Sequence, residues 1–232
     1  GKMTEQTKRK SKWLPLESNP DVLNEYAHKL GLSPSWAYTD VFGLDSELLA
    51  MVPQPVVSVL LLYPITANNE AYRREQAQKE EQIVPTDLIF YKQTISNACG
   101  TIGLLHSLAN SLDAIQVDGP LKSLIEKTKD ASPEERARVL EEDDALAEAH
   151  QSAGEAGQTR APRPDEDVKL HFICFAQKNG RLYQLDGRNS SPIDQGPTTN
   201  LLEDSAKIIK KYMELDPTET QFSVIALSAS QG

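Results

Sequence analysis

The amino-acid sequence predicts a mixed α/β or α+β fold with a partly antiparallel sheet. Segments typical of helices and of strands alternate along the 232 residues. The segment VVSVLLLYPI at 56–65 is β-branched and leucine-rich without a polar side, which indicates a central strand buried on both faces. Asn179 and Gly180 separate two further strand-like runs, and this dipeptide is the strongest short signal for a β-hairpin. The hairpin makes part of the sheet antiparallel.

Helices dominate the prediction for the first half of the chain. Asn19 and Pro20 have the character of an N-cap and a first helical residue, and Gly31 is typical of a helix end, so these residues bracket a helix. The further elements predicted in this half are a short helix, a solvated helix and a strand (LIFYKQ), over residues 45–52, 68–82 and 88–93.

The second half begins with residues 99–110, CGTIGLLHSLAN, which are apolar on every side and predict a helix buried all round. A capping pattern at Ser132 predicts a helix over 132–150. Residues 152–167 lack hydrophobic periodicity and predict a lid, a binding loop or disorder. The remaining predicted elements are two hairpin strands, a helix and a closing strand, at 168–177, 181–187, 201–215 and 222–229.

Composition limits the class of partner. The chain is 39% hydrophobic, which is enough for a core, and its 34 acidic and 24 basic residues give a net charge of −10. This charge repels a phosphate backbone and favours a basic partner surface, so we expect no nucleic acid. No repeat or linker divides the chain. We expect a single domain over 1–232, with residues 1–12 as a tag or flexible N-terminus.

The sequence also predicts the compartment. No apolar run approaches the roughly 20 residues that span a bilayer, and no apolar signal segment follows the charged N-terminus. Cys99 and Cys174 are far apart and in no CxxC pair. This pattern indicates reduced thiols, and we expect a cytoplasmic protein with access to the nucleus and without a membrane partner, a metal or a cofactor.

Cys99 is the candidate nucleophile. Ser96 and Asn97 are good N-cap residues, which would place the thiol in the first turn of the helix, where the dipole favours the thiolate. Gly100 and Gly103 each cost about 1 kcal/mol relative to alanine in a helix, a cost that close backbone approach would explain. The alternative is a small buried residue that packs the helix.

A catalytic cysteine needs a base, and the chain has four histidines. His106 lies seven residues beyond the thiol, about 10 Å along the helix, and is predicted to be a core or groove histidine. His28 is predicted to lie on the surface. His150 ends a charged helix and is predicted to be exposed, although its nearness to the loop at 152–167 keeps it as an alternative base. His171 differs from these three because a carboxylate accompanies it.

The hairpin register pairs His171 with Asp186. If Asn179 and Gly180 form a two-residue turn, Ile173 stands opposite Asp186, and His171 is the diagonal neighbour on the same face. A hydrogen bond is then within reach. A four-residue loop would place the two residues directly opposite, whereas a three-residue loop would place them on opposite faces.

The positions of Cys174 and Gln93 indicate different roles for these two residues. Strand parity points Cys174 away from His171, so Cys174 is predicted to be a structural thiol. Gln93 precedes Cys99 by six residues, and its side-chain amide could donate to the oxyanion of an acyl-transfer intermediate. A glutamine at the end of a strand is also commonly just solvated.

The segment QTISNACGTIGLLHSLAN at 93–110 resembles the nucleophile motif of the small, single-domain ubiquitin carboxyl-terminal hydrolases. LHFICF and NGRLYQLDGR are similar to the histidine and aspartate segments of that family. Further similar segments, in the family's order, are WLPLESNP, TDVFGLDSELLAMVP, PITANNE, SPEERARVLE and FSVIALSA. The resemblance covers nearly the whole chain.

The resemblance implies a thiol hydrolase with Cys99 as nucleophile, His171 as base and Asp186 as the residue that orients the base. The Gln93 amide and the Cys99 backbone N–H would form the oxyanion hole. The implied fold is papain-related, with a central antiparallel sheet flanked by helices, a knotted backbone and an active-site crossover loop at about 152–167.

The implied partner of a monomeric enzyme is ubiquitin or a ubiquitin-like modifier. The enzyme would cleave esters, thioesters and amides at the C-terminal glycine of the modifier, from small or flexible leaving groups, through a cysteine acyl-enzyme. Residues implied for the contact with ubiquitin are Leu16, Glu17, Asp40 and Glu219. One departure is Gln195, which stands where the family's PI(N/D)HG stretch has a histidine.

Overall fold

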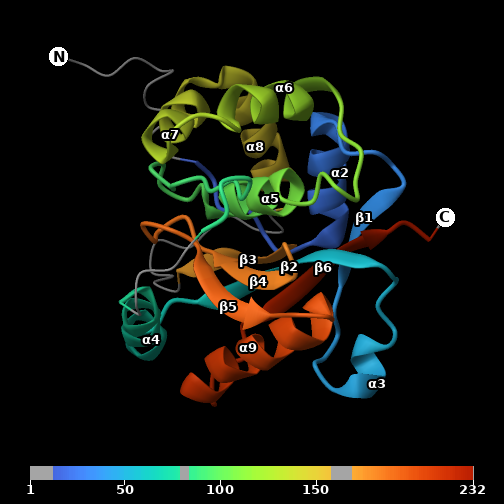
Figure 1. Cartoon of the computed structure of the whole chain (residues 1–232), viewed down its shortest axis with the longest axis vertical. Coiled ribbons are helices and arrows are strands. Elements are labelled where there is room, and N and C mark those ends of the chain that lie inside the picture. The colour runs from blue at the N-terminus through green and yellow to red at the C-terminus, as the bar shows by residue number, and fades with distance from the viewer. Residues whose placement is uncertain (1–12, 79–83, 158–168, 232) are drawn as a thin grey trace.

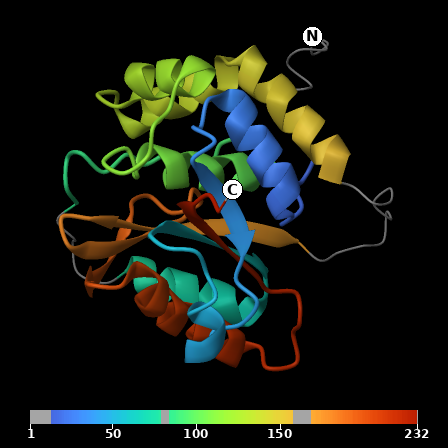
Figure 2. The ribbon, with the colours of Figure 1, turned by 90° about the vertical axis from the view of Figure 1, so that its right-hand side faces the viewer.

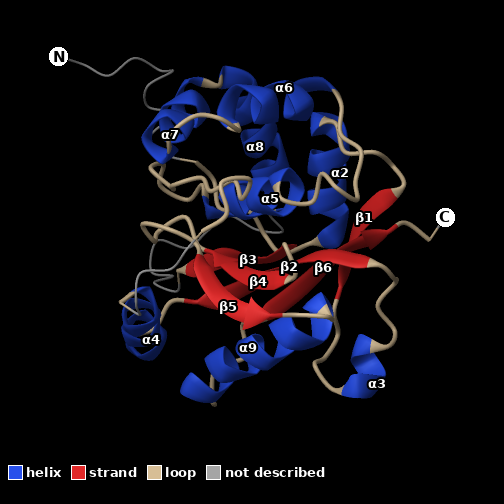
Figure 3. Ribbon diagram, viewed as in Figure 1, coloured by secondary structure: helices blue, strands red, loops and turns tan. Residues whose placement is uncertain are grey.

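A six-stranded antiparallel sheet crosses the middle of the molecule, with helices on both faces (Figure 1, Figure 3). The computed structural model describes residues 13–78, 84–157 and 169–231, and the fold is given for these residues. The strands follow the order β1-β6-β2-β3-β4-β5. Their bounds are β1 Trp36–Asp40, β2 Val56–Pro64, β3 Leu170–Lys178, β4 Arg181–Leu185, β5 Ile193–Pro197 and β6 Ser223–Ala229. The predicted mixed fold with an antiparallel sheet is confirmed.

Two layers of helices cover the sheet, as Figure 2 shows from the side. Helices α2, α5, α6, α7 and α8 lie over one face, and α3, α4 and α9 lie over the other (Figure 1). Their bounds are α2 Pro20–Leu30, α3 Ser46–Leu49, α4 Ala67–Ala77, α5 Cys99–Ala109, α6 Gly119–Thr128, α7 Pro133–Glu142, α8 Asp144–Gly157 and α9 Leu201–Leu215. Within the described ranges, none of these helices has the length and apolarity to cross a membrane.

The central strand β2 contributes to the hydrophobic core on both faces of the sheet. It pairs with β6 on one side and with β3 on the other. Leu60 and Leu62 belong to the core on the α5 side, whereas Val59, Leu61 and Tyr63 belong to the core on the α9 side. Since successive side chains of a strand point to opposite faces, this alternation confirms the predicted strand with two buried faces.

The hairpin between β3 and β4 has the predicted two-residue turn. Asn179 and Gly180 both have positive φ, 53° and 76°, as a type I′ turn requires. Lys178 pairs with Arg181 across the turn, and the antiparallel register continues from there along both strands. The register predicted from sequence is therefore confirmed.

The ends of α2 and α9 coincide with the predicted ones. The Asn19 side chain accepts the Asp21 N–H at 2.9 Å and begins α2, and Gly31, with φ 131°, ends it. An added Cβ at Gly31 would lie 1.7 Å from the Asp118 carbonyl oxygen, so a close backbone contact also requires glycine there. The side chain of Asn200 accepts the Glu203 N–H and begins α9.

Two predicted helices of the first half exist but have other bounds. Helix α3 is shorter than the predicted 45–52, and the Asp45 carboxylate caps it by accepting the Leu48 N–H at 3.0 Å. Helix α4 ends at Ala77. The end of its predicted range, residues 79–82, lies outside the described part of the chain.

The helix predicted over 132–150 is two helices in the structure. Helix α7 ends at Glu142, and Asp143 has extended backbone angles, φ −86° and ψ 97°. The Asp143 side chain then accepts the Leu146 N–H at 2.9 Å and caps α8. The break carries no Gly or Pro signal, and an acidic run is compatible with a continuous helix.

The loop predicted at 152–167 is wrong for its first six residues, because α8 continues through Gly157. Ala153 and Gly154 are buried, and an added Cβ at Gly154 would lie 2.8 Å from the Cβ of Leu14. This contact with the N-terminal segment stabilises a helical turn that small residues alone do not predict. Residues 158–167 of the implied crossover loop, like residues 1–12, lie outside the described ranges.

Three elements appear where none is predicted: β1, α6 and β5. Strands β1 and β5 are the two edges of the sheet and have five residues each. Helix α6 has recognisable signals, since Asp118 accepts the Gly119 N–H and a proline follows in the first turn.

The strand predicted at 88–93 is also wrong. Residues 88–91 are buried, but the segment belongs to no sheet. Side chains satisfy its backbone groups instead: the Asn110 side chain bonds to both the N–H and the C=O of Ile89, and Arg136 donates to the Phe90 carbonyl. A buried apolar run therefore lies beside α5 without strand partners.

Candidate active site

Cys99 is the first residue of α5, and its side chain is partly exposed. The predicted caps Ser96 and Asn97 are wrong, because Ala98 occupies the N-cap position and Asn97 adopts a left-handed backbone with φ 65°. Alanine has no side-chain acceptor. The backbone N–H groups of the first turn, which have no intrahelical partner, are thus left beside the thiol.

Both glycines after the thiol allow close packing, as predicted. An added Cβ at Gly100 would lie 2.7 to 2.9 Å from three side-chain atoms of Leu16. At Gly103 it would lie 3.3 Å from the Cβ of Phe172 on β3. Every residue of α5 after Cys99 is buried, so the predicted all-round burial is confirmed.

The hairpin places His171 against Asp186. His171 Nε2 donates to Asp186 Oδ1 at 2.7 Å, and both side chains are buried. The second ring nitrogen is left for the thiol, whose pKa the His171 side chain lowers. Cys99 Sγ also lies 3.9 Å from the carbonyl oxygen of Leu170, at the start of β3. The three residues predicted from sequence are therefore brought together.

The electrostatics of the three groups favour charge separation. Burial alone would raise the pKa of the Cys99 thiol, but the hydrogen bond and charge of His171, with a backbone hydrogen bond from Phe172, lower that pKa. Burial would lower the pKa of His171, but the charge and hydrogen bond of Asp186, with a further contribution from Cys99, raise it. The direction of both shifts favours a thiolate beside an imidazolium.

Asp186 is held as a carboxylate. Burial would raise its pKa, but the charge and hydrogen bond of His171, together with the charge and backbone N–H of Arg188, lower it. The Arg188 N–H donates to Asp186 Oδ1 at 2.9 Å. The Arg188 guanidinium lies 2.8 Å from Glu70 of α4 and 3.2 Å from the Tyr63 hydroxyl. Sequence reasoning missed this support, since no local spacing links α4 to the hairpin.

Gln93 lies beside the loop that follows Asp186. Its backbone N–H donates to the Gly187 carbonyl at 2.9 Å, and its side-chain Nε2 donates to the Ile95 carbonyl at 3.3 Å. An added Cβ at Gly187 would lie 2.8 Å from Ile102 Cγ2 and 3.0 Å from Gln93 Cβ. Glycine at 187 therefore lets the aspartate loop approach both α5 and Gln93.

The other three histidines hydrogen-bond to groups other than the Cys99 thiol. His106 is buried, as predicted. His150 is fully buried rather than exposed, because α8 extends past it: Nε2 donates to the Leu14 carbonyl and Nδ1 bonds to Thr101 Oγ1, both at 2.6 Å. Burial lowers the pKa of His150 to about 4. His28 is partly exposed, where the surface is predicted, and donates to the Trp36 carbonyl.

Cys174, the second thiol, lies on β3. Cys174 is buried in the core on the α5 side, and burial raises its pKa, as a structural thiol requires. Across the described ranges, no group of three or more His, Cys, Asp or Glu side chains could hold a metal ion.

Gln195 takes part in a buried polar chain behind the histidine. Its Nε2 donates to Gln184 Oε1 at 2.9 Å, and Gln184 Nε2 donates to the Tyr212 hydroxyl at 2.7 Å. The Tyr212 ring lies 5.0 Å from the ring of Tyr63, which meets the His171 imidazole edge-on at 5.9 Å. The residue that departs from the family pattern is thus tied to the core by a hydrogen bond to Gln184.

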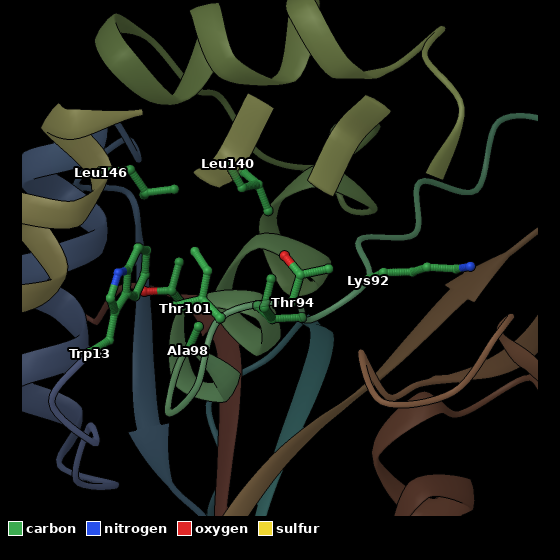
Figure 4. A pocket seen from close by; sticks show the side chains of 9 residues that line it. Trp13, Lys92, Thr94, Ala98, Thr101, Leu140 and Leu146 are labelled. Atoms are coloured by element: carbon green, nitrogen blue, oxygen red, sulfur yellow. The ribbon is translucent and has the colours of Figure 1, made fainter. Parts of the chain in front are cut away.

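A small cavity beside the start of α5 does not extend the site. Figure 4 shows Trp13, Ala98, Thr101, Leu140 and Leu146 among the side chains that line it. Its volume is about 10 Å³, room for one water molecule at most. The thiol is not in its lining, so the cavity is no substrate pocket.

A wider groove of about 560 Å³ lies between the start of α2, the end of β1 and α3. Phe42 and Met51 line it and are 77% and 70% exposed. Asp40 and Asp21 line it too, and burial together with the charge of Asp21 raises the pKa of Asp40. An apolar surface with acidic neighbours is suited to a protein partner with apolar and basic groups.

The four residues implied for ubiquitin contact lie in different surroundings. Asp40 is exposed in the groove, and Glu17 and Glu219 are partly exposed. Leu16 is buried and packs on Gly100, where it supports the helix of Cys99. The Glu219 carboxylate accepts the backbone N–H groups of the two residues that follow it.

The chain is similar to proteins of a known family. A model of "Ubiquitin carboxyl-terminal hydrolase, family 1" matches residues 13–214. A ubiquitin carboxyl-terminal hydrolase of Drosophila melanogaster is 44% identical over 224 residues, which cover 94% of this chain and 98% of the relative. Ubiquitin carboxyl-terminal hydrolase 3 of Arabidopsis thaliana is 48% identical over 223 residues, 94% of each chain. Isozyme L1 of Rattus norvegicus is 41% identical over 218 residues, 92% of this chain and 96% of the relative.

A solved structure shares the fold. The catalytic domain of Trichinella spiralis UCH37, bound to ubiquitin vinyl methyl ester, superposes with a TM-score of 0.78 at 23% identity. The match covers 94% of this chain and 96% of the other.

Proposed function

Because the chain belongs to the ubiquitin carboxyl-terminal hydrolase family and is a cysteine-type deubiquitinating hydrolase, we propose that Cys99 is its nucleophile. The proposed reaction cleaves esters, thioesters and amides at the C-terminal glycine of ubiquitin or a ubiquitin-like modifier, with small or flexible leaving groups. The observation that carries the proposal is the buried His171–Asp186 hydrogen bond of 2.7 Å beside a thiol of lowered pKa.

The proposed acylation step uses the three groups in turn. The Cys99 thiolate attacks the carbonyl carbon of the terminal glycine, and the carbonyl electron pair moves to the oxygen. When this intermediate collapses, the bond to the leaving group breaks, and the leaving group takes the proton of the His171 imidazolium. Ubiquitin is then held as a thioester on Cys99. Asp186 holds the imidazole in the tautomer that presents Nδ1 to the thiol.

Deacylation reverses the proton movements. His171 takes a proton from a water molecule, whose oxygen attacks the thioester carbonyl. Collapse of the second intermediate breaks the carbon–sulfur bond, expels the Cys99 thiolate and releases the carboxylic acid of ubiquitin, which gives its proton to water. The Gln93 amide and the Cys99 backbone N–H would donate to the oxyanion in both steps. Cys99 begins α5, and the Gln93 backbone is tied to the aspartate loop through the Gly187 carbonyl.

The proposed contact with ubiquitin extends from the thiol to the groove beside β1. The net charge of −10 favours a partner with a basic tail, and Glu17, Asp40 and Glu219 would supply acidic groups to it. Phe42 and Met51 would cover apolar surface of the modifier. Leu16 would act indirectly, by packing against Gly100.

The test is release of a fluorophore from the C-terminus of ubiquitin by wild type and two cysteine variants. We expect rapid release by wild type, none by Cys99→Ala, and release close to wild type by Cys174→Ala, which removes the structural thiol. Comparable turnover by Cys99→Ala would overturn the assignment of the nucleophile. Ubiquitin binding without release by folded wild type would mean a binding protein.

A further inference from the structure

The segment at residues 88–93, here called the Gln93 segment, is held in place by His106 of α5 and by Asn110, the C-cap residue of that helix. The Asn110 side chain accepts the Ile89 N–H at 2.7 Å and donates to the Ile89 carbonyl at 2.8 Å. One turn earlier in α5, His106 Nε2 accepts the Tyr91 N–H at 2.8 Å. These bonds take the place of the strand ladder that the sequence predicts for the segment.

The two anchors, His106 and Asn110, are spaced along α5 as their partners Tyr91 and Ile89 are spaced along the extended segment. At 100° per residue, His106 and Asn110 each lie within about 20° of the Cys99 direction along α5. The spacing of four positions from His106 to Asn110 corresponds to about 6 Å of helical rise. The two extended steps from Ile89 to Tyr91 span nearly the same distance, about 6.8 Å. The segment therefore runs back along α5 toward its first turn.

In an extended segment every second residue points the same way, and Gln93 follows Ile89 and Tyr91 in this alternation. Its N–H donates to the Gly187 carbonyl at 2.9 Å, which ties the same end of the segment to the aspartate loop. In Figure 4, Lys92 and Thr94 lie on the chain that leads from the segment into the start of α5. Gln93 is thus placed between the helix of the nucleophile and the hairpin of its base.

The chemistry of His106 suits a fixed acceptor. Burial lowers its pKa to about 3, so the ring is neutral at physiological pH. Since Nε2 accepts the Tyr91 N–H, the ring proton resides on Nδ1, for which the described residues offer no hydrogen-bond partner. The ring also stacks on Phe90, with centroids 5.3 Å apart and planes 9° apart. An unpaired buried N–H lowers the stability of the fold, and an apolar residue at position 106 would avoid this loss.

We propose that His106 and Asn110 are positioning residues for the oxyanion donor: they align the Gln93 amide with the thiol through the backbone of residues 88–93. This inference rests on the proposed function, because it assigns the alignment of a group that acts in it. Helix α5 would then fix the positions of both Cys99 and Gln93 relative to each other. Neither anchor contacts the reacting atoms.

A double-mutant cycle tests the inference, with the fluorogenic ubiquitin substrate and the variants His106→Leu, Gln93→Ala and both together. In the wild-type background we expect His106→Leu to lower kcat about tenfold to a hundredfold through misalignment, with KM changed less than about twofold. In the Gln93→Ala background the same substitution should lower kcat less than about twofold, because the group it aligns is already absent. Equal losses in both backgrounds would overturn the inference.

His150→Leu is the matched control. His150 is also fully buried, neutral and hydrogen-bonded to α5 through Thr101, but it bonds to no residue of the Gln93 segment. Its effect on kcat should be the same with and without Gln93. Coupling of His150 to Gln93 as strong as that of His106 would show that the cycle reports general destabilisation, and would reject the specific role.

A conservative variant and a second anchor complete the design. His106→Gln retains an acceptor and should recover most of the kcat that His106→Leu loses. If His106→Leu does not fold, Asn110→Ser replaces it in the cycle, with the same expected coupling and the same overturning result. Alkylation of Cys99 by iodoacetamide, which needs no oxyanion donor, should keep the wild-type rate in each folded variant. Failure of wild type to release the fluorophore would instead refute the proposed function.

Discussion

His171 Nε2 donates to Asp186 Oδ1 at 2.7 Å across a hairpin, although 15 residues separate the two side chains in sequence. The two positive φ angles of Asn179 and Gly180 set the turn, and the turn sets the register. Both partners are buried, so the pair has little competition from water. The pH dependence of Cys99 reactivity should follow from the hydrogen bond between His171 and Asp186.

The first prediction concerns the pH at which Cys99 becomes a nucleophile. The pKa of the thiol is lowered mainly by His171, against the effect of burial, so alkylation by iodoacetamide should begin below the ordinary cysteine pKa of about 8.5. In His171→Gln the onset should move to higher pH. The measurement is the alkylation rate against pH in a Cys174→Ala background. The same pH profile with and without His171→Gln would contradict the thiolate–imidazolium pair.

The second prediction concerns stability and Asp186. Its folded-state pKa is lower than the unfolded value of about 3.9, so the carboxylate stabilises the fold above that pH, and this contribution is lost as pH falls through the folded pKa. Asp186→Asn should lower the free energy of unfolding by about 3 kcal/mol at pH 5 to 6, and the difference should shrink below about pH 4. Urea titrations at several pH values measure it.

Asp113→Asn is the control for this prediction. Asp113 is almost fully exposed and lies 3.9 Å from Lys178, so its loss should change stability negligibly. A difference for Asp186→Asn that stays constant down to pH 2 would contradict the lowered pKa.

The third prediction concerns the glycine behind the aspartate. A Cβ at residue 187 would lie 2.8 Å from Ile102 and 3.0 Å from Gln93, so Gly187→Ala must displace the loop. We expect a stability loss of about 1–3 kcal/mol from overpacking and a fall in kcat of at least about tenfold. Gly157→Ala is the control, because its Cβ would have ordinary contacts of 3.6 to 3.8 Å. Equal effects of the two substitutions on kcat would refute the explanation.

The fourth prediction concerns the polar chain behind the histidine. Gln195→Leu leaves the oxygen of Gln184 without this donor, which should lower the free energy of unfolding by about 1–2 kcal/mol. Activity should change little, since Gln195 contacts no reacting group. Urea unfolding measures the loss, and Gln116→Leu on the exposed surface should cost much less. A large fall in kcat at full stability would instead assign Gln195 to catalysis.

Local signals account for the parts of the site that could be predicted. A turn dipeptide and strand parity paired His171 with Asp186, and apolar residues on every side placed Cys99 in a buried helix. Each signal acts over a few residues, through φ preferences, capping or side-chain alternation. The bounds of α2 and α9 follow from the same kind of information.

Wrong predictions arose where distant groups decide the outcome. His150 has the sequence context of an exposed helix end, yet the N-terminal segment covers it and accepts its N–H. The break at Asp143 has no Gly or Pro marker, and the capping aspartate stands in an acidic run that is compatible with a continuous helix. The support of Asp186 by Arg188 and Glu70 joins α4 to the hairpin and has no spacing that a sequence could reveal.

By itself, the sequence determined the mixed fold, the hairpin and its register, and the pairing of His171 with Asp186. Only the tertiary structure decided that residues 88–93 leave the sheet and bond to α5 through His106 and Asn110. The physical reason is that buried backbone groups require partners but do not specify which ones. Turn chemistry and periodicity are set by neighbours in sequence. Whether a buried backbone group bonds to a strand or to a side chain depends on which group the fold packs against it.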